Sequence, residues 1–467
     1  MSNFSFTLSS HELLAVANFF SEFEGTILLF SGGVSETVKF SYLGLFPHES
    51  VLIRGDTLVH NQGSSQILKI NNPWDALQNE FFSKFSQSID SFAFGWLSYQ
   101  MGFTADLDYH FNTQYTSTTP DAYWQRCAVT LIFNHEMNEC SVQLELGQLL
   151  QMDKCYQEWI QKLSIKDGWI ELLKKLSLDD VLSNTQTINK IHEDQLSSNN
   201  FINKVQKAQE YIKAGEIYQV NLSQPFFFDH VTSPFKLFYQ MCINHPAPFS
   251  AFINTKELAI VSISPERFLC KQGETLETRP IKGTIKRGTS EASDKILKET
   301  LLNSEKERAE LLMITDLMRN DLGKISQVGS VHTLSIWKCE TYSKVFHLVS
   351  IIQSLAKITL NSLEIVRSCF PGGSITGCPK LRSMEIINEL EDIPRGLYTG
   401  SIGYFKSSGD FDLNIAIRTL VILKNGPASL HLGSGIVYDS DPLQEYYEIL
   451  AKGASFFESM KHPIEMI

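Results

Sequence analysis

The feature that most constrains the fold is the grouping of strand-like and helix-like segments into separate runs. Strand patterns predominate from residue 217 to about residue 285, helical patterns follow from 293 to 322, and mixed elements occupy the rest. Strict alternation of strands and helices would favour a parallel, doubly wound sheet, whereas runs of one type favour an α+β fold. We therefore predict an α+β chain with largely antiparallel sheets.

The amino-terminal third also contains recognisable elements. Ser10 is predicted to cap a helix that continues to Phe20, and Thr26–Phe30 has the pattern of a buried strand. Two strands over 127–134 and 139–146 flank a short polar turn and predict a hairpin. Helical patterns follow at 152–164 and 168–176.

A polar stretch over residues 177–199 is predicted to be a linker. It would separate an amino-terminal region, 1–176, from a second region, 200–467. The second region opens with an amphipathic pattern from Phe201 to Ile212, and Gly215 is a suitable residue to follow that helix. The 467 residues are thus expected to form two domains or one large intertwined domain.

Composition excludes several classes of partner and location. The net charge is −12, and the acidic residues are scattered with no basic run, which argues against nucleic acid or an anionic membrane as partner. The eight cysteines include no C-x-x-C pair and are expected to be reduced thiols. No signal peptide and no membrane-length apolar run is recognised, so a cytoplasmic protein is expected.

One lysine lies in a constrained segment, Thr278-Arg279-Pro280-Ile281-Lys282-Gly283-Thr284. Pro280 fixes its own φ, and Gly283 permits a turn or a close approach to a ligand. Glu266 lies close before this segment in sequence and could act as a general acid. The alternatives are a solvated turn lysine and a glutamate paired with Arg267.

Two pairs of glutamates lie three residues apart on predicted helices. Glu307 and Glu310 share one helix face, as do Glu445 and Glu448 on the last helix. Such pairs can supply carboxylates to Mg²⁺, which takes one or two of them and keeps several waters. Helix capping by Ser304 and an ion pair between Glu448 and Lys452 are the structural alternatives.

Other candidates are an arginine, a histidine and several glycine-rich segments. Arg418 lies in an alternating segment, Leu413–Leu420, that predicts a strand, and it could bind either a substrate carboxylate or a structural acidic partner. His347 lies alone on a predicted apolar strand. The glycine-rich segments 371–380 and 433–435 offer backbone N–H groups that could hold a carboxylate.

The order of these segments closely resembles the family of chorismate-utilising enzymes from about residue 200 to the end. The motifs are Gln219-Val-Asn-Leu222, Ser264-Pro-Glu-Arg-Phe268, Arg279-Pro-Ile-Lys-Gly-Thr284, Arg308-Ala-Glu310, His347-Leu-Val-Ser350, Pro371-Gly-Gly-Ser-Ile-Thr-Gly377, Ala416-Ile-Arg-Thr419 and Glu445-Tyr-Tyr-Glu448. Within the family, a lysine at position 282 resembles the aminodeoxychorismate synthase branch, because anthranilate synthases usually have alanine there. Cys378 departs from the alanine usual at that place.

The resemblance implies a sandwich of two packed, largely antiparallel sheets flanked by helices. It also implies roles for individual residues. Lys282 would be the nucleophile and Glu266 the general acid, with His347 as a further catalytic residue. Chorismate would be held by Arg418, Thr376, Gly377, Gly433, Ser434, Gly435 and Lys452, and Mg²⁺ by Glu310 and Glu448 with assistance from Glu307 and Glu445.

The expected reaction on chorismate needs ammonia. The chain has no Gly-x-Cys-x-Gly nucleophile elbow, so a separate glutamine amidotransferase subunit is expected as partner. Alternatives on the same scaffold are an anthranilate, isochorismate or salicylate synthase. A catalytically silent regulatory subunit is a further alternative, disfavoured by the intact set of candidate residues.

Overall fold

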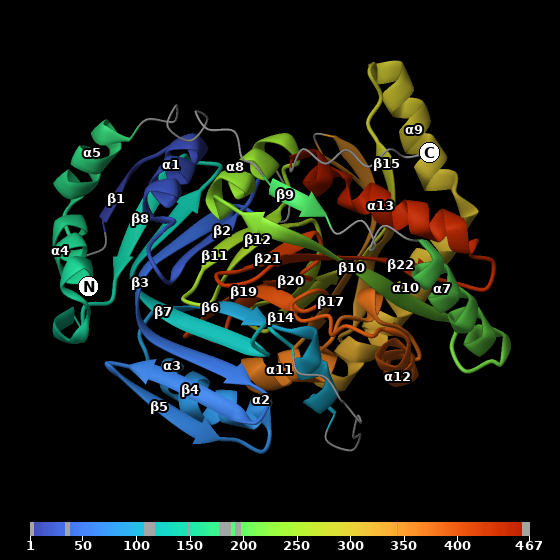
Figure 1. The fold of residues 1–467 in the computed structure, drawn as a ribbon, viewed down its shortest axis with the longest axis horizontal. Coiled ribbons are helices and arrows are strands. Elements are labelled where there is room, and N and C mark those ends of the chain that lie inside the picture. Colours follow the sequence, from blue (N-terminus) through green and yellow to red (C-terminus); the bar gives the residue numbers. More distant parts are fainter. Residues whose placement is uncertain are drawn as a thin grey trace.

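The computed structural model describes residues 4–32, 38–106, 117–147, 149–176, 188–191, 198–342 and 344–459. Every strand pair recorded among them is antiparallel, and the strands join into one continuous 22-stranded network. The predicted α+β class with antiparallel sheets is therefore confirmed. Two layers can be distinguished within the network (Figure 1).

The first layer runs through nine strands and carries three short strands at its edges. Its order is β8 (Glu139–Leu144), β7 (Ala122–Asn134), β3 (Phe40–Arg54), β2 (Thr26–Phe30), β11 (Phe249–Asn254), β12 (Leu258–Ser264), β21 (Thr419–Leu423), β22 (Ala428–Ile436) and β10 (Gln219–Val231), with β1 (Phe4–Thr7) on β8 and both β9 (Ile188–Ile191) and β18 (Gly377–Cys378) on β10.

The second layer shares β3 and β7 with the first. It comprises β5 (Ser64–Lys69), β4 (Thr57–Gln62), β3, β7, β6 (Phe92–Leu97), β19 (Ser401–Lys406), β20 (Phe411–Asn414), β13 (Arg267–Gln272), β14 (Thr275–Arg279) and β17 (Val345–Leu355), with β15 (Ile281–Lys286) and β16 (His332–Thr341) also paired to β17.

The two long strands pass from one layer into the other. Residues 42–44 of β3 pair with β2 of the first layer, and residues 50–54 pair with β4 of the second. The β3–β7 register shifts between Pro47 and Glu49, where a bulge lets the ribbon change direction. The sandwich is thus closed along one side by continuous strands.

A hydrophobic cluster fills the space between the layers. It combines side chains of β2, β11, β12 and β21 with aromatic side chains of β6 and β19. Trp96 stacks on Tyr123 with ring centroids 4.7 Å apart, and Tyr42 contacts Tyr404 at 4.6 Å. The prediction of two packed sheets is confirmed by this shared core.

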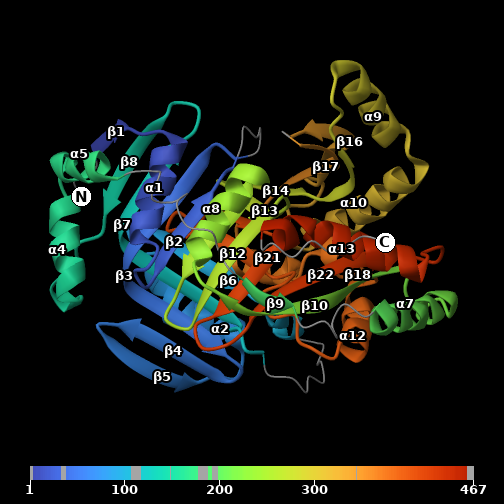
Figure 2. The same cartoon turned by 45° about the horizontal axis from the view of Figure 1, so that its top comes forward.

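Helices cover the outer faces of both layers (Figures 1 and 2). The first layer packs against α1 (Ser10–Phe20), α4 (Lys154–Leu163), α5 (Lys166–Lys175), α7 (Ser198–Lys213), α8 (Pro234–Asn244), α12 (Lys380–Leu390) and α13 (Pro442–Ser459). The second packs against α2 (Pro73–Leu77), α3 (Ser83–Phe85), α10 (Glu305–Ile325) and α11 (Ser362–Cys369), while α9 (Glu291–Asn303) projects beside β15 and β16. In the described part of the chain, none of the helices is long and apolar enough to cross a membrane.

Most local predictions agree with these elements. Strand β2 and the β7–β8 hairpin lie where expected, but the cap of α1 is Ser9 rather than Ser10, because Ser9 and Glu12 form a reciprocal capping box. Much of the predicted linker, 177–187 and 192–197, lies outside the described residues. Strands from before and after it pair through β2–β11 and β6–β19.

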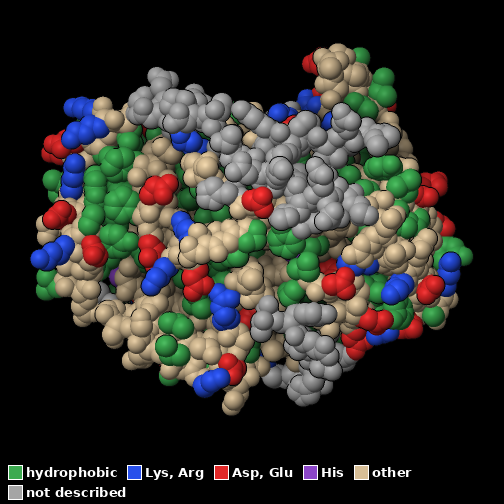
Figure 3. Space-filling view, viewed as in Figure 1, with side chains coloured by type: hydrophobic (Ala, Val, Ile, Leu, Met, Phe, Trp, Pro, Cys, Tyr) green, Lys and Arg blue, Asp and Glu red, His purple; other side chains and the backbone are tan. Residues whose placement is uncertain are grey.

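The surface charge is mixed, as the composition predicts. On the face shown in Figure 3, acidic and basic side chains are interspersed among hydrophobic ones, and the described residues show no broad basic area there.

Candidate active site

Lys282 lies on a strand rather than on a loop. It is the second residue of β15 and pairs with Leu348 of β17, and the register shifts just after it, between Lys282 and Thr284. Gly283 has a φ of +68°, and a Cβ there would lie 3.0 Å from Glu307 Oε2. The glycine therefore permits a bulge that aims Lys282 while α10 approaches closely.

The Lys282 amine points towards the glycine segment of β22. A Cβ built on Gly435 would lie 3.5 Å from Lys282 Nζ and 2.3 Å from Gln219 Nε2. A side chain at position 435 would thus displace Gln219 and crowd the amine. The Lys282 amine and the β22 backbone consequently share one space.

Glu266 is a buried carboxyl group beside the same amine. Ser374 Oγ donates a hydrogen bond of 2.8 Å to Glu266 Oε1, and the Ile281 backbone N–H also donates to this carboxyl. Burial raises the pKa of Glu266 to about 7, against the lowering effects of Ser374 and the Lys282 charge. Near neutral pH, Glu266 therefore carries a proton in a large fraction of molecules and can act as a general acid.

The two glutamate pairs approach one another from α10 and α13. Burial raises the pKa of Glu307, and the charges of Glu310 and Glu448 raise it further. Burial pushes the pKa of Glu448 upward, but Lys452 and Ser434 bring it below its ordinary value. Across the described residues, no ready-made cluster of three or more His, Cys, Asp or Glu side chains is found.

Ser434 joins the α13 pair to strand β22. Its Oγ lies 2.5 Å from Glu445 Oε2 and 3.0 Å from Glu448 Oε1. The other Glu445 oxygen accepts a hydrogen bond of 2.7 Å from Ser440 Oγ. Glu445 is therefore held by two serines, whereas Glu448 is 49% exposed and paired with Lys452 Nζ at 2.7 Å.

Lys452 also donates to the Gly433 carbonyl oxygen at 3.1 Å. This contact places the Lys452 ammonium group between the backbone of β22 and the Glu448 carboxylate. Lys452 thereby belongs to the same side-chain cluster, through Glu448.

Arg418 does not lie on a strand, contrary to the expectation for 413–420. Strand β20 ends at Asn414 and β21 begins at Thr419, and Arg418 between them has a φ of +49°. Its carbonyl oxygen accepts a hydrogen bond from the Ile263 N–H at 3.0 Å, which fixes the turn. The alternating residues of 413–420 thus belong to two strands, which the kink at Arg418 separates.

The Arg418 guanidinium has no ion-pair partner among the described residues, and burial is the one effect that lowers its pKa. His347 lies nearby: burial and the Arg418 charge lower the pKa of His347 to about 3. His347 is therefore neutral, and its Nδ1 lies 2.8 Å from Thr284 Oγ1 on β15. An anion would complete this environment.

Thr376 and Gly377 lie at the end of β10 that carries Gln219. The Asn221 N–H donates to the Thr376 carbonyl oxygen at 2.8 Å, and Val220 pairs with Gly377. Gly377 has a φ of +147°, and a Cβ there would lie 2.2 Å from the Gln219 carbonyl oxygen. Only glycine fits at this approach.

Two side chains were not assigned from the sequence, although both lie in the motifs quoted above. Ser374 was missed because a serine in a glycine-rich turn gives no sign of its partner Glu266. Gln219 was missed because alternation places it on a strand but not beside Gly435. Its Oε1 is buried without a hydrogen-bond partner among the described residues.

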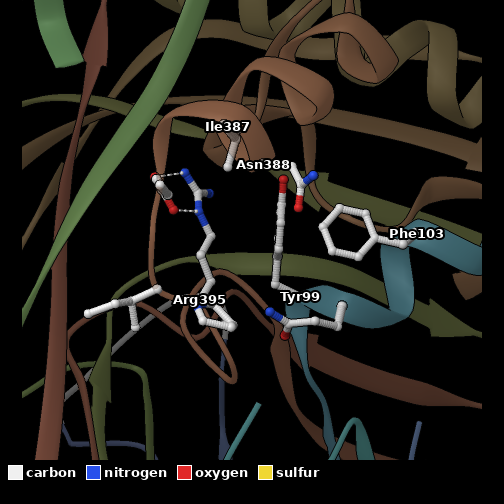
Figure 4. Close-up of a pocket in the computed structure, with 9 residues that line it drawn as sticks. Tyr99, Phe103, Ile387, Asn388 and Arg395 are labelled. Atoms are coloured by element: carbon white, nitrogen blue, oxygen red, sulfur yellow. Dashed lines mark hydrogen bonds and ion pairs between the residues drawn. The ribbon is translucent and has the colours of Figure 1, made fainter. Parts of the chain in front are cut away.

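Figure 4 shows a separate small pocket beside Arg395, whose Nη1 donates to the Ile375 carbonyl oxygen. It is lined by Tyr99, Gln100, Phe103, Ile387, Asn388, Glu391, Ile393, Pro394 and Arg395. None of the residues predicted for the site lines this pocket.

Comparison with known proteins identifies relatives of this arrangement. A family model described as chorismate binding enzyme matches residues 46–458. Aminodeoxychorismate synthase component 1 of Bacillus subtilis (strain 168) is 42% identical over 252 residues, 54% of this chain and 53% of that protein. The chloroplastic aminodeoxychorismate synthase of Arabidopsis thaliana is 46% identical over 260 residues, 55% of this chain and 28% of that protein.

A solved structure extends the similarity to most of the chain. Anthranilate synthase component I from Streptococcus pneumoniae TIGR4 matches with a TM-score of 0.75 and 27% identity, covering 90% of this chain and 93% of that one. In the sequence comparisons, by contrast, the matched region spans about half of the Bacillus protein and little more than a quarter of the plant protein.

Proposed function

Because this chain belongs to the chorismate binding enzyme family, we propose that it converts chorismate and ammonia into 4-amino-4-deoxychorismate. The observation that carries the choice of product is the Lys282 amine, which shares its space with Gly435 and lies beside the protonatable Glu266. An amine and an acid in one site are what a displacement with a poor leaving group requires.

Chorismate carries two carboxylates, and two parts of the site suit them. Arg418 is a half-buried cation that no described carboxylate balances, so we assign it to the enolpyruvyl carboxylate. The backbone at Gly433–Gly435 and the Thr376–Gly377 turn are proposed to hold the ligand further; of these glycines, Gly435 faces the Lys282 amine, so its lack of a side chain leaves room there. Neutral His347 can exchange a hydrogen bond with the ligand without adding charge.

We assign Mg²⁺ to the carboxylates of Glu310 and Glu448, with assistance from Glu307 and Glu445. The support is their electrostatic coupling, since the charges of Glu310 and Glu448 raise the pKa of Glu307. Bound there, Mg²⁺ would supply Lewis-acid stabilisation to the ring carboxylate of chorismate. The residues of α10 and α13 would orient that carboxylate and exclude other anions.

Lys282 is proposed to form a covalent adduct with the substrate. In its neutral form, the amine bonds to ring carbon 2, both conjugated ring double bonds shift, and the hydroxyl leaves carbon 4 as water with the proton of Glu266. Ammonia then bonds to carbon 4, the double bonds shift back, the Lys282 amine is released, and the proton of the new ammonium group returns to Glu266. The sum is chorismate plus ammonia giving 4-amino-4-deoxychorismate plus water.

Ammonia is proposed to come from a separate glutamine amidotransferase subunit. The name of the Bacillus relative, component 1, supports a second component. The protein alone should then use ammonium salts but not glutamine. Production of the aminated product from glutamine by the isolated chain would contradict this part of the proposal.

Anthranilate synthesis is the second candidate, favoured by the match to the Streptococcus structure over most of the chain. Both reactions start from chorismate and ammonia, so substrate use does not separate them. They differ in product, because anthranilate is an aromatic amine that has lost the enolpyruvyl group.

Product identification is therefore the decisive experiment. The protein is incubated with chorismate, MgCl₂ and ammonium chloride, and the products are separated and identified by mass and absorbance. A product in which amine has replaced hydroxyl with the enolpyruvyl group retained supports the proposal. Anthranilate, isochorismate, salicylate or unchanged chorismate would overturn it.

A further inference from the structure

Arg395 and Glu391 form a buried ion pair behind the candidate site (Figure 4). Arg395 Nε lies 2.8 Å from Glu391 Oε2, and Nη2 lies 2.7 Å from Oε1. The two side chains are 1% and 5% exposed. Burying two charges costs desolvation energy that such a pair often fails to recover, so stability alone is a weak reason for it.

All five N–H donors of Arg395 are used. Besides the two bonds to Glu391, Nη1 donates to the Ile375 carbonyl oxygen at 3.1 Å and to Thr399 Oγ1 at 3.2 Å. Nη2 donates to the Asn221 carbonyl oxygen at 2.5 Å. A lysine has three donors around one atom and could not reproduce this fork.

Two of the main-chain acceptors adjoin the segments assigned to substrate binding. Ile375 immediately precedes Thr376, and Ser374 on its other side donates to Glu266. Asn221 pairs across β10–β22 with Gly435. One guanidinium thus contacts the segment that hydrogen-bonds the proposed acid and the strand that neighbours the proposed carboxylate cradle.

Glu391 completes the same edge of β10. Its Oε1 accepts the Ser223 N–H at 2.7 Å, and Ser223 pairs with Gly433. Short strand β18 pairs with β10 at Gln219 and Val220 only, and β9 begins to pair at Phe228. Between them, the side chains of Arg395 and Glu391 take the place of a neighbouring strand.

Tyr99 closes the arrangement from the pocket side. Figure 4 shows its ring between Arg395 and Phe103, and the guanidinium carbon lies 4.8 Å from the ring centroid. Tyr398 covers the guanidinium as well, at 5.6 Å. Both rings lie within cation–π distance of the guanidinium, and their attraction favours this orientation of the arginine.

We infer that Arg395 and Glu391 are positioning residues that hold the 374–377 segment and β10 in register, and thereby place Ser374 against Glu266 and the β22 backbone against the substrate. The inference rests on the proposed function, since it assigns these segments to that site. Neither residue touches the reacting atoms, so both act through their neighbours.

The test uses Arg395→Lys and Glu391→Gln in the full chain, with Arg382→Lys as the matched control. Arg382 lies on α12 and makes ion pairs with Glu216 and Glu385, but it is 34% exposed and contacts neither segment. Activity is measured from chorismate and ammonium chloride across pH, with free ammonia held constant. Misplacement of a positioned group typically costs up to about 100-fold, so kcat/KM should fall roughly 10- to 100-fold in Arg395→Lys and little in Arg382→Lys.

The pH profile separates positioning from general weakening. The Ser374 hydrogen bond lowers the pKa of Glu266, and the Lys282 charge acts in the same direction. If Arg395 places Ser374, Arg395→Lys weakens that bond and the activity loss at high pH moves to higher pH. Ser374→Ala should move it likewise, and Arg395→Lys combined with Ser374→Ala should move it no further.

Hydrogen–deuterium exchange tests, independently of catalysis, whether the ion pair holds the 374–377 segment and β10 in place. Peptides covering 219–224 and 372–377 should exchange faster in Arg395→Lys and Glu391→Gln than in wild type or Arg382→Lys. If the activity of Arg395→Lys were lost at the same pH as in wild type and its exchange were unchanged, the inference would be overturned. Failure of both pair variants to fold would also overturn it, because the pair would then serve stability. A wild-type protein inactive on chorismate would refute the proposed function. The exchange measurement would still show whether Arg395 and Glu391 hold the 374–377 segment and β10 in register.

Discussion

Two groups of charged residues in this protein differ in whether their charges are paired. In the paired network, Arg267 contacts Asp412 and Glu277, and Arg279 contacts Glu277 and Glu340, all at 2.7–3.1 Å. In the open site, Arg418 has no described ion-pair partner, and Glu307 is repelled by Glu310 and Glu448. The charges of the paired network are balanced within the fold, whereas those of the open site would be balanced by the proposed anionic substrate and Mg²⁺.

Structural and candidate functional charges in this fold differ in whether their ion pairing is complete. Arg279 is only three residues from Lys282, and it was the nearest cation in sequence, yet its guanidinium is engaged by two carboxylates on β14 and β16. Lys282 carries no such pair among the described residues. Position in the sequence therefore says less about function than the completeness of the local charge pairing.

The largest expected effect is on Lys282. Lys282→Ala should lower formation of the aminated product by roughly three orders of magnitude or more, because a nucleophile has no substitute in the site. Product is quantified by mass after incubation with chorismate and ammonium chloride. Lys286→Ala on the same strand is the control, since Lys286 is exposed. Undiminished turnover of Lys282→Ala would remove the nucleophile assignment.

The two groups should separate most clearly in their arginines. Arg267→Gln should lower the free energy of unfolding by about 3–5 kcal/mol, because it removes the ion-pair partner of buried Asp412, whereas Glu277 keeps Arg279. Arg418→Gln should leave stability nearly unchanged but raise KM for chorismate roughly 10- to 150-fold, the value of a charged hydrogen bond. Denaturant unfolding and steady-state kinetics on both variants check this. If Arg418→Gln were the less stable of the two variants, the division into a paired network and an open site would be contradicted.

Glu266 should show opposite effects on stability and activity. Its pKa in the folded protein is raised to about 7, above the ordinary value of 4.5, so the folded state binds more protons between these values. Stability attributable to the protonated carboxyl is thus present at low pH and lost as pH rises through 7. Relative to wild type, the free energy of unfolding of Glu266→Gln should rise by up to about 3 kcal/mol between pH 5 and pH 8. The same variant should lose most of its activity. If the difference in unfolding free energy between Glu266→Gln and wild type were the same at pH 5 and pH 8, the raised pKa of Glu266 would be contradicted.

The smallest expected effect concerns the proposed metal ligands. Glu448→Gln should raise the Mg²⁺ concentration for half-maximal activity by roughly tenfold or more, because one charged oxygen ligand is lost. Glu458→Gln, also on α13 but exposed, should leave it unchanged. The same titration after chelation with EDTA gives the baseline, and a magnesium requirement equal to that of wild type would remove Glu448 from the ligand set.

The fold could be predicted largely because apolar periodicity is a local property. The buried strand at 26–30, the β7–β8 hairpin and the helix that begins after Ser304 all follow from patterns within a few residues. Arg418 could not be placed, because its positive φ is set by Ile263, a residue more than a hundred positions away. Alternation cannot reveal a kink that a neighbouring strand imposes.

The site was accessible through its residue types but not through its contacts. The glutamate pairs, Lys282 and Glu266 were identifiable as candidates, yet their approach depends on a bulge at Gly283 and on the packing of α10 against β15. Ser374 gave no signal, because its partner Glu266 lies 108 positions away in the sequence. Arg395 and Glu391 gave none, because their hydrogen bonds to main-chain atoms depend on the fold and not on a side-chain pattern.

The interleaving of strands has a consequence for synthesis of the chain on the ribosome. Gly95 of β6 pairs with Gly403 of β19, about 300 residues later, so at roughly 5–20 residues per second β6 waits some tens of seconds for its partner. Over that time, one edge of β6 is expected to be without its partner in the nascent polypeptide, and β2 waits likewise until β11 has been made. Binding by a chaperone is therefore expected to matter more for the yield of this protein than for one built from sequential hairpins, and slowing translation after β6 should increase aggregation.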